Sequence, residues 1–171
     1  MHSSTPDQVT IRPAAEADAD AVGAIRADAI ATSTGLWIDE PPTAESSAAW
    51  ARGHRERGSM LVACDDASGA VLGYATFGPL RDYSGYRRTA EVSIYLHADA
   101  QGRGIGRALL ERLVELAREA GMHSLQGWIE AGNAASIALH ARCGFTEVAR
   151  IPESGYKFGR WWDLVIMQRL L

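Results

Sequence analysis

Residues 92–110 read Val-Ser-Ile-Tyr-Leu-His-Ala-Asp-Ala-Gln-Gly-Arg-Gly-Ile-Gly-Arg-Ala-Leu-Leu, and this stretch decides the fold. An apolar strand leads into a loop with three alternate glycines, and the loop opens into a helical pattern. The first N–H groups of a helix lack intrahelical partners and lie at the positive end of its dipole. The junction therefore predicts a strand, an anion-binding loop and a helix in direct succession. The loop by itself is also compatible with an ordinary glycine-rich turn between a strand and a helix.

The spacing of the glycines excludes two common nucleotide motifs. Arg107 stands where the third glycine of the dinucleotide fingerprint would fall, and no Gly-Lys pair is present for a Walker loop. The pattern that remains is Q-x-x-G-x-G, formed by Gln101, Gly104 and Gly106. These glycines allow an anion to approach the backbone closely. The loop thus predicts a phosphorylated cofactor that is not held by either nucleotide motif.

The length of the chain predicts one domain over residues 1–171, because 171 residues can bury a core of their own. A net charge of −4 without a basic stripe argues against nucleic-acid binding. Cys64 and Cys143 are far apart, so neither a disulfide framework nor a metal site is expected. The N-terminus lacks the apolar run of a signal peptide, and a membrane-spanning segment is not expected. We expect a cytoplasmic protein without a membrane partner.

Periodicity and turn residues predict the remaining elements. Strands are expected over Val9–Pro13, Met60–Cys64, Val71–Phe77, Thr89–Leu96, His123–Glu130, Phe145–Ile151 and Asp163–Leu170. Helices are expected over Glu16–Ala31, from an N-cap at Thr43 to about Arg57, from the glycine loop through Ala120, and over Asn133–Arg142. This order of strands and helices predicts a mixed α/β sheet.

A second block, Asn133 to Phe145, reads N-A-A-S-I-A-L-H-A-R-C-G-F. With the glycine loop, it resembles the GCN5-related N-acetyltransferase (GNAT) family. The segments Thr89–Tyr95 and Gly155–Gln168 resemble its phosphinothricin and methionine sulfoximine acetyltransferase branch. The resemblance implies a mostly antiparallel sheet flanked by helices, acetyl-CoA as cofactor, and a homodimer. It also implies acetyl transfer to the amino group of a small amino acid or analogue in a ternary complex.

The resemblance assigns the cofactor to three segments of the chain. The loop and helix start would hold the pyrophosphate, strand N–H groups would hold the pantetheine arm and an oxyanion, and the Asn133 helix would contact the arm. The expected cofactor-binding residues are Ile94, Tyr95, Leu96, Gln101, Gly102, Arg103, Gly104, Ile105, Gly106, Arg107, Asn133, Ser136 and His140.

Amide formation from a thioester needs a neutral amine, yet an alkyl ammonium with a pKa near ~10 is mostly charged at neutral pH. A general base must take the proton, and Glu91 matches the glutamate that the branch carries on this strand. Alternation places Ser93 and Tyr95 on the same face, where partial burial would raise the pKa of Glu91. His140 stands where relatives often carry a tyrosine general acid. Whether His140 donates a proton or only contacts the cofactor stays open.

The acceptor's acidic group would meet cations in loops that the resemblance places beside the acceptor pocket. The expected substrate-binding residues are Arg81, Tyr86, Arg88, Glu91 and Lys157. Each cation could equally be a surface charge. Two other functions stay open: acetylation of a protein N-terminus or lysine, and a coenzyme A-binding module without catalysis. The sequence does not say which amine is the acceptor.

Overall fold

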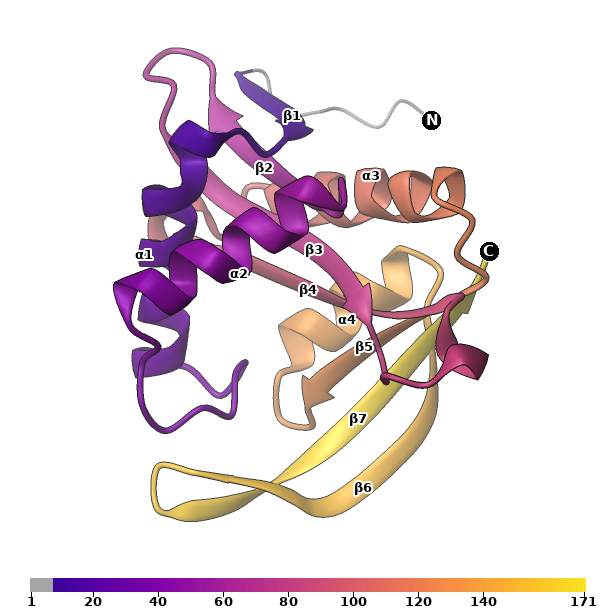
Figure 1. Ribbon diagram of the computed structural model, residues 1–171. Coiled ribbons are helices and arrows are strands. Elements are labelled where there is room, and N and C mark those ends of the chain that lie inside the picture. The colour runs from indigo at the N-terminus through magenta and orange to yellow at the C-terminus, as the bar shows by residue number, and fades with distance from the viewer. Residues whose placement is uncertain (1–7) are drawn as a thin grey trace.

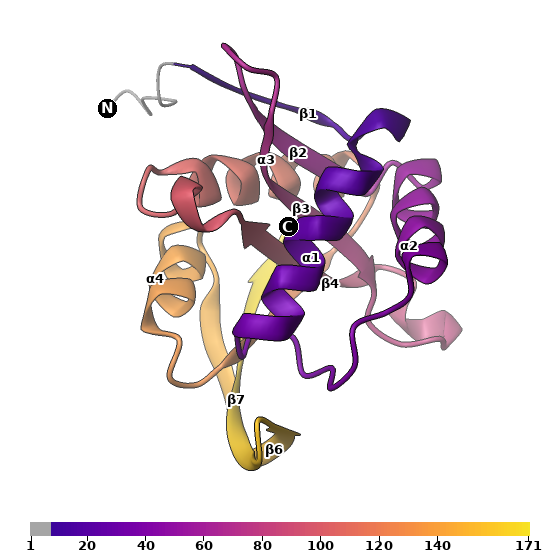
Figure 2. The same cartoon turned by 90° about the vertical axis from the view of Figure 1, so that its left-hand side faces the viewer.

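A sheet of seven strands separates two layers of helices in the computed structural model, which describes residues 8–171 (Figures 1 and 2). The strands are β1 (Val9–Pro13), β2 (Met60–Asp65), β3 (Val71–Pro79), β4 (Thr89–Leu96), β5 (Ser124–Glu130), β6 (Thr146–Lys157) and β7 (Arg160–Leu170). The helices are α1 (Ala19–Thr32), α2 (Ala44–Glu56), α3 (Ile105–Glu119) and α4 (Ala134–Arg142). In Figure 2, α1 and α2 cover one face of the sheet, and α3 and α4 cover the other. The predicted fold class is confirmed.

The strand order is β1-β2-β3-β4-β5-β7-β6, and β4 and β5 form the parallel pair of this sheet. Helix α3 connects these two strands, as a parallel crossover requires. Their pairing runs only from Thr89↔Ser124 to Val92↔Gly127. Strand β4 nevertheless continues to Leu96, paired there with β3. The two parallel strands therefore diverge beyond Val92, in the middle of the sheet.

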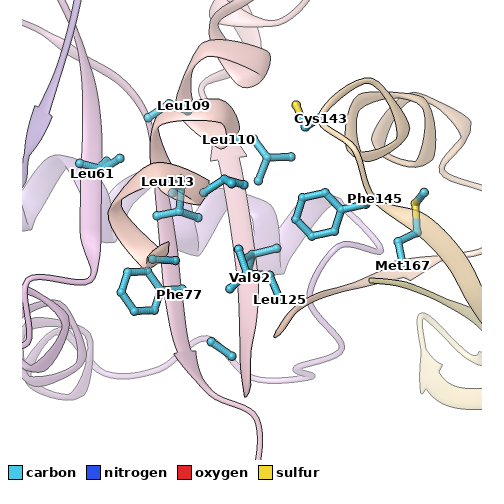
Figure 3. Packing of buried hydrophobic residues seen from close by; sticks show 14 of the residues in the cluster. Leu61, Phe77, Val92, Leu109, Leu110, Leu113, Leu125, Cys143, Phe145 and Met167 are labelled. Carbon is cyan, nitrogen blue, oxygen red and sulfur yellow. The ribbon is translucent and has the colours of Figure 1, made fainter. Parts of the chain in front are cut away.

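The larger core lies between the sheet and the α3–α4 layer (Figure 3). Leu109, Leu110 and Leu113 of α3 are fully buried against Val92 and Leu125 of the two parallel strands. The apolar face of α3, which the helical periodicity predicts, is thus the face that packs. A smaller core on the opposite face joins α1 and α2 to β2 and β3, and its buried members are Val22, Ile25, Ala51, Met60, Val62, Cys64 and Tyr74.

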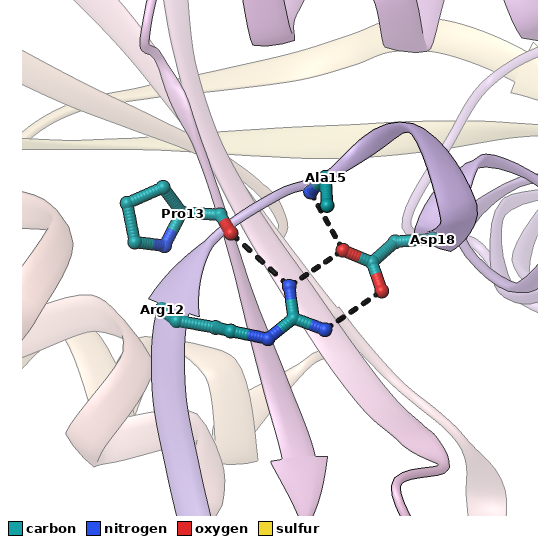
Figure 4. A network of polar contacts seen from close by, with 4 residues as sticks. All are labelled: Arg12, Pro13, Ala15 and Asp18. Carbon is teal, nitrogen blue, oxygen red and sulfur yellow. Dashed lines mark hydrogen bonds and ion pairs between the residues drawn. The ribbon is translucent and has the colours of Figure 1, made fainter.

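An ion pair fixes the start of α1 against the end of β1 (Figure 4). The guanidinium of Arg12 donates to both carboxylate oxygens of Asp18, over 2.7 and 2.9 Å. Asp18 also accepts from the backbone N–H of Ala15 at 2.7 Å. The Arg12 hydrogen bond is the main reason that the pKa of the buried Asp18 is lowered. The predicted helix Glu16–Ala31 accordingly begins as a short 3-10 turn over Glu16–Asp18 and becomes α1 at Ala19.

The C-terminal hairpin is longer than predicted. We expected strands to end at Ile151 and begin at Asp163, but β6 reaches Lys157 and β7 starts at Arg160. The pairing register shifts between Ile151 and Gly155, so the hairpin continues past an irregularity that holds Pro152. Its tip is a two-residue turn in which both central residues have positive φ, the geometry that matches strand twist. The hairpin projects from the body at the bottom of Figure 1.

Within residues 8–171, no helix combines the length and the apolar character that crossing a bilayer requires. The same part of the chain contains no group of three His, Cys, Asp or Glu side chains placed to hold a metal ion.

Candidate active site

The divergence of β4 from β5 exposes backbone N–H groups in the centre of the sheet. The N–H of His97 donates to the carbonyl of Leu72 over 2.8 Å and continues the ladder with β3. Since alternate residues of an antiparallel strand direct both polar groups to one neighbour, Tyr95 also faces β3. The N–H groups of Ile94 and Leu96 face the other way, into the gap that β5 has left. These two residues are therefore placed to bond an amide-bearing ligand, whereas the backbone N–H of Tyr95 is directed to β3.

The glycine loop lies at the end of β4 and leaves the start of α3 uncapped. Gly104 is the N-cap, with φ 79° and no side chain to satisfy the helix donors. The first helical bond runs from Ala108 N to Gly104 O at 3.2 Å, so the N–H groups of Ile105, Gly106 and Arg107 have no intrahelical acceptor. This is the arrangement that binds phosphate groups at helix N-termini.

The expected loop residues differ in what they can offer to a cofactor. Gln101, Gly102 and Arg103 are exposed, so their side chains or backbone are accessible. Ile105 and Gly106 are buried and can contribute backbone N–H groups only. Arg107 is more than half exposed, and its Nε donates to Glu111 at 2.7 Å. Its guanidinium would have to share or leave that carboxylate to bind a pyrophosphate.

Helix α4 carries the third expected segment. The side-chain oxygen of Asn133 accepts from the N–H of Ser136 at 3.0 Å, so Asn133 is the N-cap of α4. Ser136 is half-buried on the first turn. The N–H donors of the Asn133 amide have no acceptor among the described residues, so they are available to a ligand.

His140 is buried at the point where the two parallel strands separate. Its Nδ1 lies 2.8 Å from the carbonyl oxygen of Ser136, and because a carbonyl only accepts, Nδ1 carries the proton. Its Nε2 is buried without a partner. A Cβ on Gly127, the last β5 residue paired with β4, would lie 2.7 Å from that Nε2. Burial lowers the pKa of His140, so the imidazole is neutral and its Nε2 is a free acceptor.

These groups fit coenzyme A. The unpartnered Nε2 of His140 and the strand N–H groups of Ile94 and Leu96 all lie along the divergence of β4 and β5. The uncapped N-terminus of α3 is at its edge, because a Cβ on Gly106 would touch the side chains of Leu96 and Leu139. A ligand with an amide-bearing arm would accept hydrogen bonds from the strand N–H groups, and its pyrophosphate would accept them from the N–H groups at the start of α3. Buried polar groups without partners are otherwise unfavourable in a folded protein.

A cavity lies on the face of the sheet that α1 and α2 cover. Its volume is about 230 Å³, and Glu91, Ser93 and Tyr95 of β4 all line it. The prediction that these three side chains share a face is confirmed. Glu91 is half-buried, and burial raises the pKa of its carboxyl group. Tyr95 donates from its hydroxyl to the carbonyl of Gly35 over 2.9 Å, which ties the loop after α1 to the cavity wall.

The cations expected to bind the acceptor lie elsewhere. Arg81, Tyr86 and Arg88 are exposed on the β3–β4 connection and do not line this cavity. Lys157 is only 2% exposed. Its Nζ donates to the carbonyls of Ile30, Ser33 and Leu36, over 2.5, 2.8 and 2.6 Å. The structure thus shows Lys157 in a role that the sequence did not suggest: its three protons hold the end of α1 and the following loop.

The basic side chains of the cavity were missed from the sequence: Arg26 of α1, His54 of α2 and Arg57 directly after α2. The sequence offered only a weak indication for Arg26. Arg26 lies one helical turn after the buried Val22, at the edge of the apolar stripe of α1. Nothing local distinguishes it from a solvated helix charge, and only the packing of α1 and α2 over β3 and β4 brings these residues to Glu91.

Fold and site together define a coenzyme A-dependent acyltransferase: the candidate cofactor-binding N–H groups lie along the divergence of β4 and β5, and a small cavity with a carboxylate is lined by the same strand β4. Comparison with known proteins agrees with this class. The family model described as "Acetyltransferase (GNAT) family" matches residues 14–145. The chain belongs to the GNAT family and is an acetyl-CoA-dependent N-acetyltransferase, as predicted.

Individual relatives cover nearly the whole chain. An L-methionine sulfoximine/L-methionine sulfone acetyltransferase of Pseudomonas paraeruginosa is 42% identical over 159 residues, 93% of this chain and 92% of the relative. A phosphinothricin N-acetyltransferase of Alcaligenes faecalis is 36% identical, over 99% of this chain and 92% of the relative. The solved structure of the acetyltransferase YncA from Salmonella typhimurium with its cofactor acetyl-CoA has a TM-score of 0.92 and 42% identity. That match covers 96% of this chain and 95% of YncA.

Proposed function

We propose that this enzyme acetylates the amino group of a small amino acid or analogue, of the methionine sulfoximine or phosphinothricin type, by direct attack in a ternary complex. The observation that carries the proposal is Glu91, a half-buried carboxylate in a cavity of about 230 Å³, on the strand β4 that also carries the unpaired N–H groups of Ile94 and Leu96. The volume is below the roughly 300–1,000 Å³ typical of drug-sized ligands, which favours a small acceptor. The names of the relatives support the same class of amine.

The proposed chemistry begins with the acceptor's proton. Glu91 takes it from the ammonium group, directly or through one water, and burial has raised the pKa of this carboxyl group toward that of a useful base. Bound acetyl-CoA supplies an acetyl thioester that a neutral amine can attack. The N–H groups of Ile94 and Leu96 lie beyond the point where β4 and β5 stop pairing, and they would stabilise negative charge on the thioester carbonyl oxygen.

His140 is proposed as a cofactor contact and not as the general acid. Its Nδ1 proton is held by the Ser136 carbonyl, so its Nε2 has no proton to donate. Proton donation is also not required, because a thiol with a pKa of about 8.5 leaves readily as a thiolate. The buried Nε2 would accept a hydrogen bond from the pantetheine end or from a water beside it.

A homodimer in the cytoplasm is also proposed. The tip of the β6–β7 hairpin exposes aromatic side chains, with Tyr156, Phe158 and Trp161 each more than half exposed. Exposed apolar groups of this size favour a protein interface. Cys64 and Cys143 are both free thiols, which agrees with a reducing compartment. Light scattering tests the dimer, and a monomer at micromolar concentration would contradict it.

The function is tested by a thiol-release assay with acetyl-CoA and a panel of amines. The panel holds methionine sulfoximine, methionine sulfone, phosphinothricin, common amino acids, polyamines, and peptides with a free N-terminus or lysine. We expect turnover with amino acids or their analogues, and little turnover by Glu91→Gln despite unchanged coenzyme A affinity in calorimetry. Turnover with peptides alone would establish the protein-acetylating alternative. Binding without turnover on any amine would establish the non-catalytic module.

A further inference from the structure

The cavity that contains Glu91 has two guanidinium groups in its wall, Arg26 and Arg57. Among residues 8–171, neither arginine forms an ion pair with a carboxylate. Glu91 is the one acidic residue that lines the cavity, so its wall carries an excess of positive charge. A guanidinium has a planar fork of N–H donors that suits carboxylate and similar oxyanions. The cavity is therefore built for a ligand with an anionic group.

Arg26 is held in place by an aromatic ring. Its guanidinium carbon lies 4.6 Å from the centroid of the Trp50 ring, and the residue is half-buried between α1 and α2. Stacking orders the guanidinium before any ligand arrives, which lowers the entropic cost of binding. Arg57 is exposed at the end of α2, so it lies at the rim of the cavity. The two cations thus differ: Arg26 is pre-ordered within the wall, and Arg57 is solvated.

His54, the imidazole of the cavity wall, does not compete with these cations for an anionic group. Burial, followed by the charges of Arg57 and Arg26, lowers the pKa of His54 to about 4, so His54 is neutral at pH 7. Burial also raises the pKa of Glu91. Glu91 and Arg26 line the same cavity, so one ligand in it can offer an amine to Glu91 and an anion to Arg26.

We infer that Arg26, assisted by Arg57 at the rim, binds an anionic group of the acceptor and makes the enzyme select acidic amines and amino acids over neutral amines. This inference rests on the proposed function, because the ligand is the acceptor amine. Arg26 takes the place of Lys157 as the cation that binds the acceptor's anionic group. The anion site would therefore lie on α1 and α2, and not on the β3–β4 connection that carries Arg81 and Arg88.

The test compares acceptors that differ only in charge. One pair is L-methionine sulfone and its α-carboxamide, and the other is glutamate and glutamine. For each pair, the ratio of kcat/KM for the acid to that for its neutral partner is measured in the wild type, Arg26→Gln and Arg57→Gln. Taking the change of this ratio between variants cancels the different amine pKa values of the two acceptors.

We expect Arg26→Gln to lower the acid-to-neutral ratio at least ~10-fold for one or both pairs, through KM, with the KM for acetyl-CoA unchanged. Arg57→Gln should lower it less, since a solvated rim charge contributes little. Arg52→Gln, an exposed arginine of α2 outside this cavity, is the matched control and should leave the ratio unchanged. A purely structural role of Arg26 would slow both members of a pair equally and would overturn the inference.

Two further outcomes separate this inference from the function on which it rests. If Arg26→Gln does not fold, calorimetric titration of wild type and Arg57→Gln, both with coenzyme A, still compares binding of the acid with that of the amide. Equal affinity for the two overturns the anion site. Collapse of the ratio in Arg81→Gln but not in Arg26→Gln would do so as well. If no amine in either pair releases thiol or binds, the proposed function fails instead.

Discussion

Replacing Lys157 by Met tests whether this residue holds the fold or binds the acceptor. The ammonium group donates three hydrogen bonds to backbone carbonyls at the end of α1 and in the loop that follows. The Ile30 carbonyl belongs to the last turn of α1, where carbonyls have no intrahelical partner. Methionine fills a similar volume but donates nothing. All three carbonyls would then lose their charged donor in a buried position.

The expected cost follows from these contacts. A buried acceptor left without its donor costs about 1–3 kcal/mol, so three carbonyls that lose one shared ammonium should together destabilise the protein by about 3–5 kcal/mol. For a chain of this length, each kcal/mol lowers Tm by about 2–4 °C. We therefore expect Tm to fall by roughly 6–20 °C in Lys157→Met. Urea denaturation followed by circular dichroism measures the free energy of unfolding independently.

The control is Arg160→Met, which removes an exposed cation from the same hairpin tip. That side chain stacks on Trp162, with its guanidinium carbon 3.9 Å from the ring centroid, so its loss should cost no more than about 1 kcal/mol. One result would refute the reasoning: a Lys157→Met enzyme within about 1 kcal/mol of wild type whose KM for the acceptor is strongly raised. Lys157 would then bind the acceptor, as the sequence first indicated.

Three further predictions concern the two ligand sites. A pH–rate profile tests the role of Glu91. Because burial raises the pKa of Glu91, kcat/KM of the wild type should fall as the pH drops through a pKa above 4.5. The Glu91→Gln variant should recover most of its lost rate at high pH, where the amine is neutral without a base. Gly104→Val should raise the coenzyme A Kd at least ~10-fold in calorimetry, since φ 79° strains a β-branched residue; unchanged affinity would place the cofactor elsewhere. The pKa of His54 is lowered from 6.5 to about 4, so the unfolded chain binds the extra proton between these values. Neutral His54 therefore contributes about 3 kcal/mol to the free energy of unfolding above pH 6.5, and this contribution should be lost as the pH falls toward 4. Denaturation at a series of pH values measures it, and a His54→Gln variant whose free energy of unfolding depends on pH as in the wild type would contradict this.

The donor half of the site follows from local sequence. The glycine loop, the N-cap at Asn133 and the face shared by Glu91, Ser93 and Tyr95 depend on neighbouring residues or on the two-residue period of a strand. The structure places them as expected, because helix starts and strand faces are set by backbone geometry over a few residues. The tip of the hairpin was not predicted, since the strands there continue past a register shift that alternation does not anticipate.

The acceptor half depends on tertiary structure. The sequence by itself determined the glycine loop, the strand position of Glu91 and the family resemblance, because each is written in a contiguous segment. Only the packing of α1 and α2 over β3 and β4 decided that Arg26 joins Glu91 in one cavity. Only the fold brought the ammonium group of Lys157 to carbonyls more than 100 residues earlier in the chain. An isolated charge carries no local sign of its partner, since that partner is chosen by where distant elements pack.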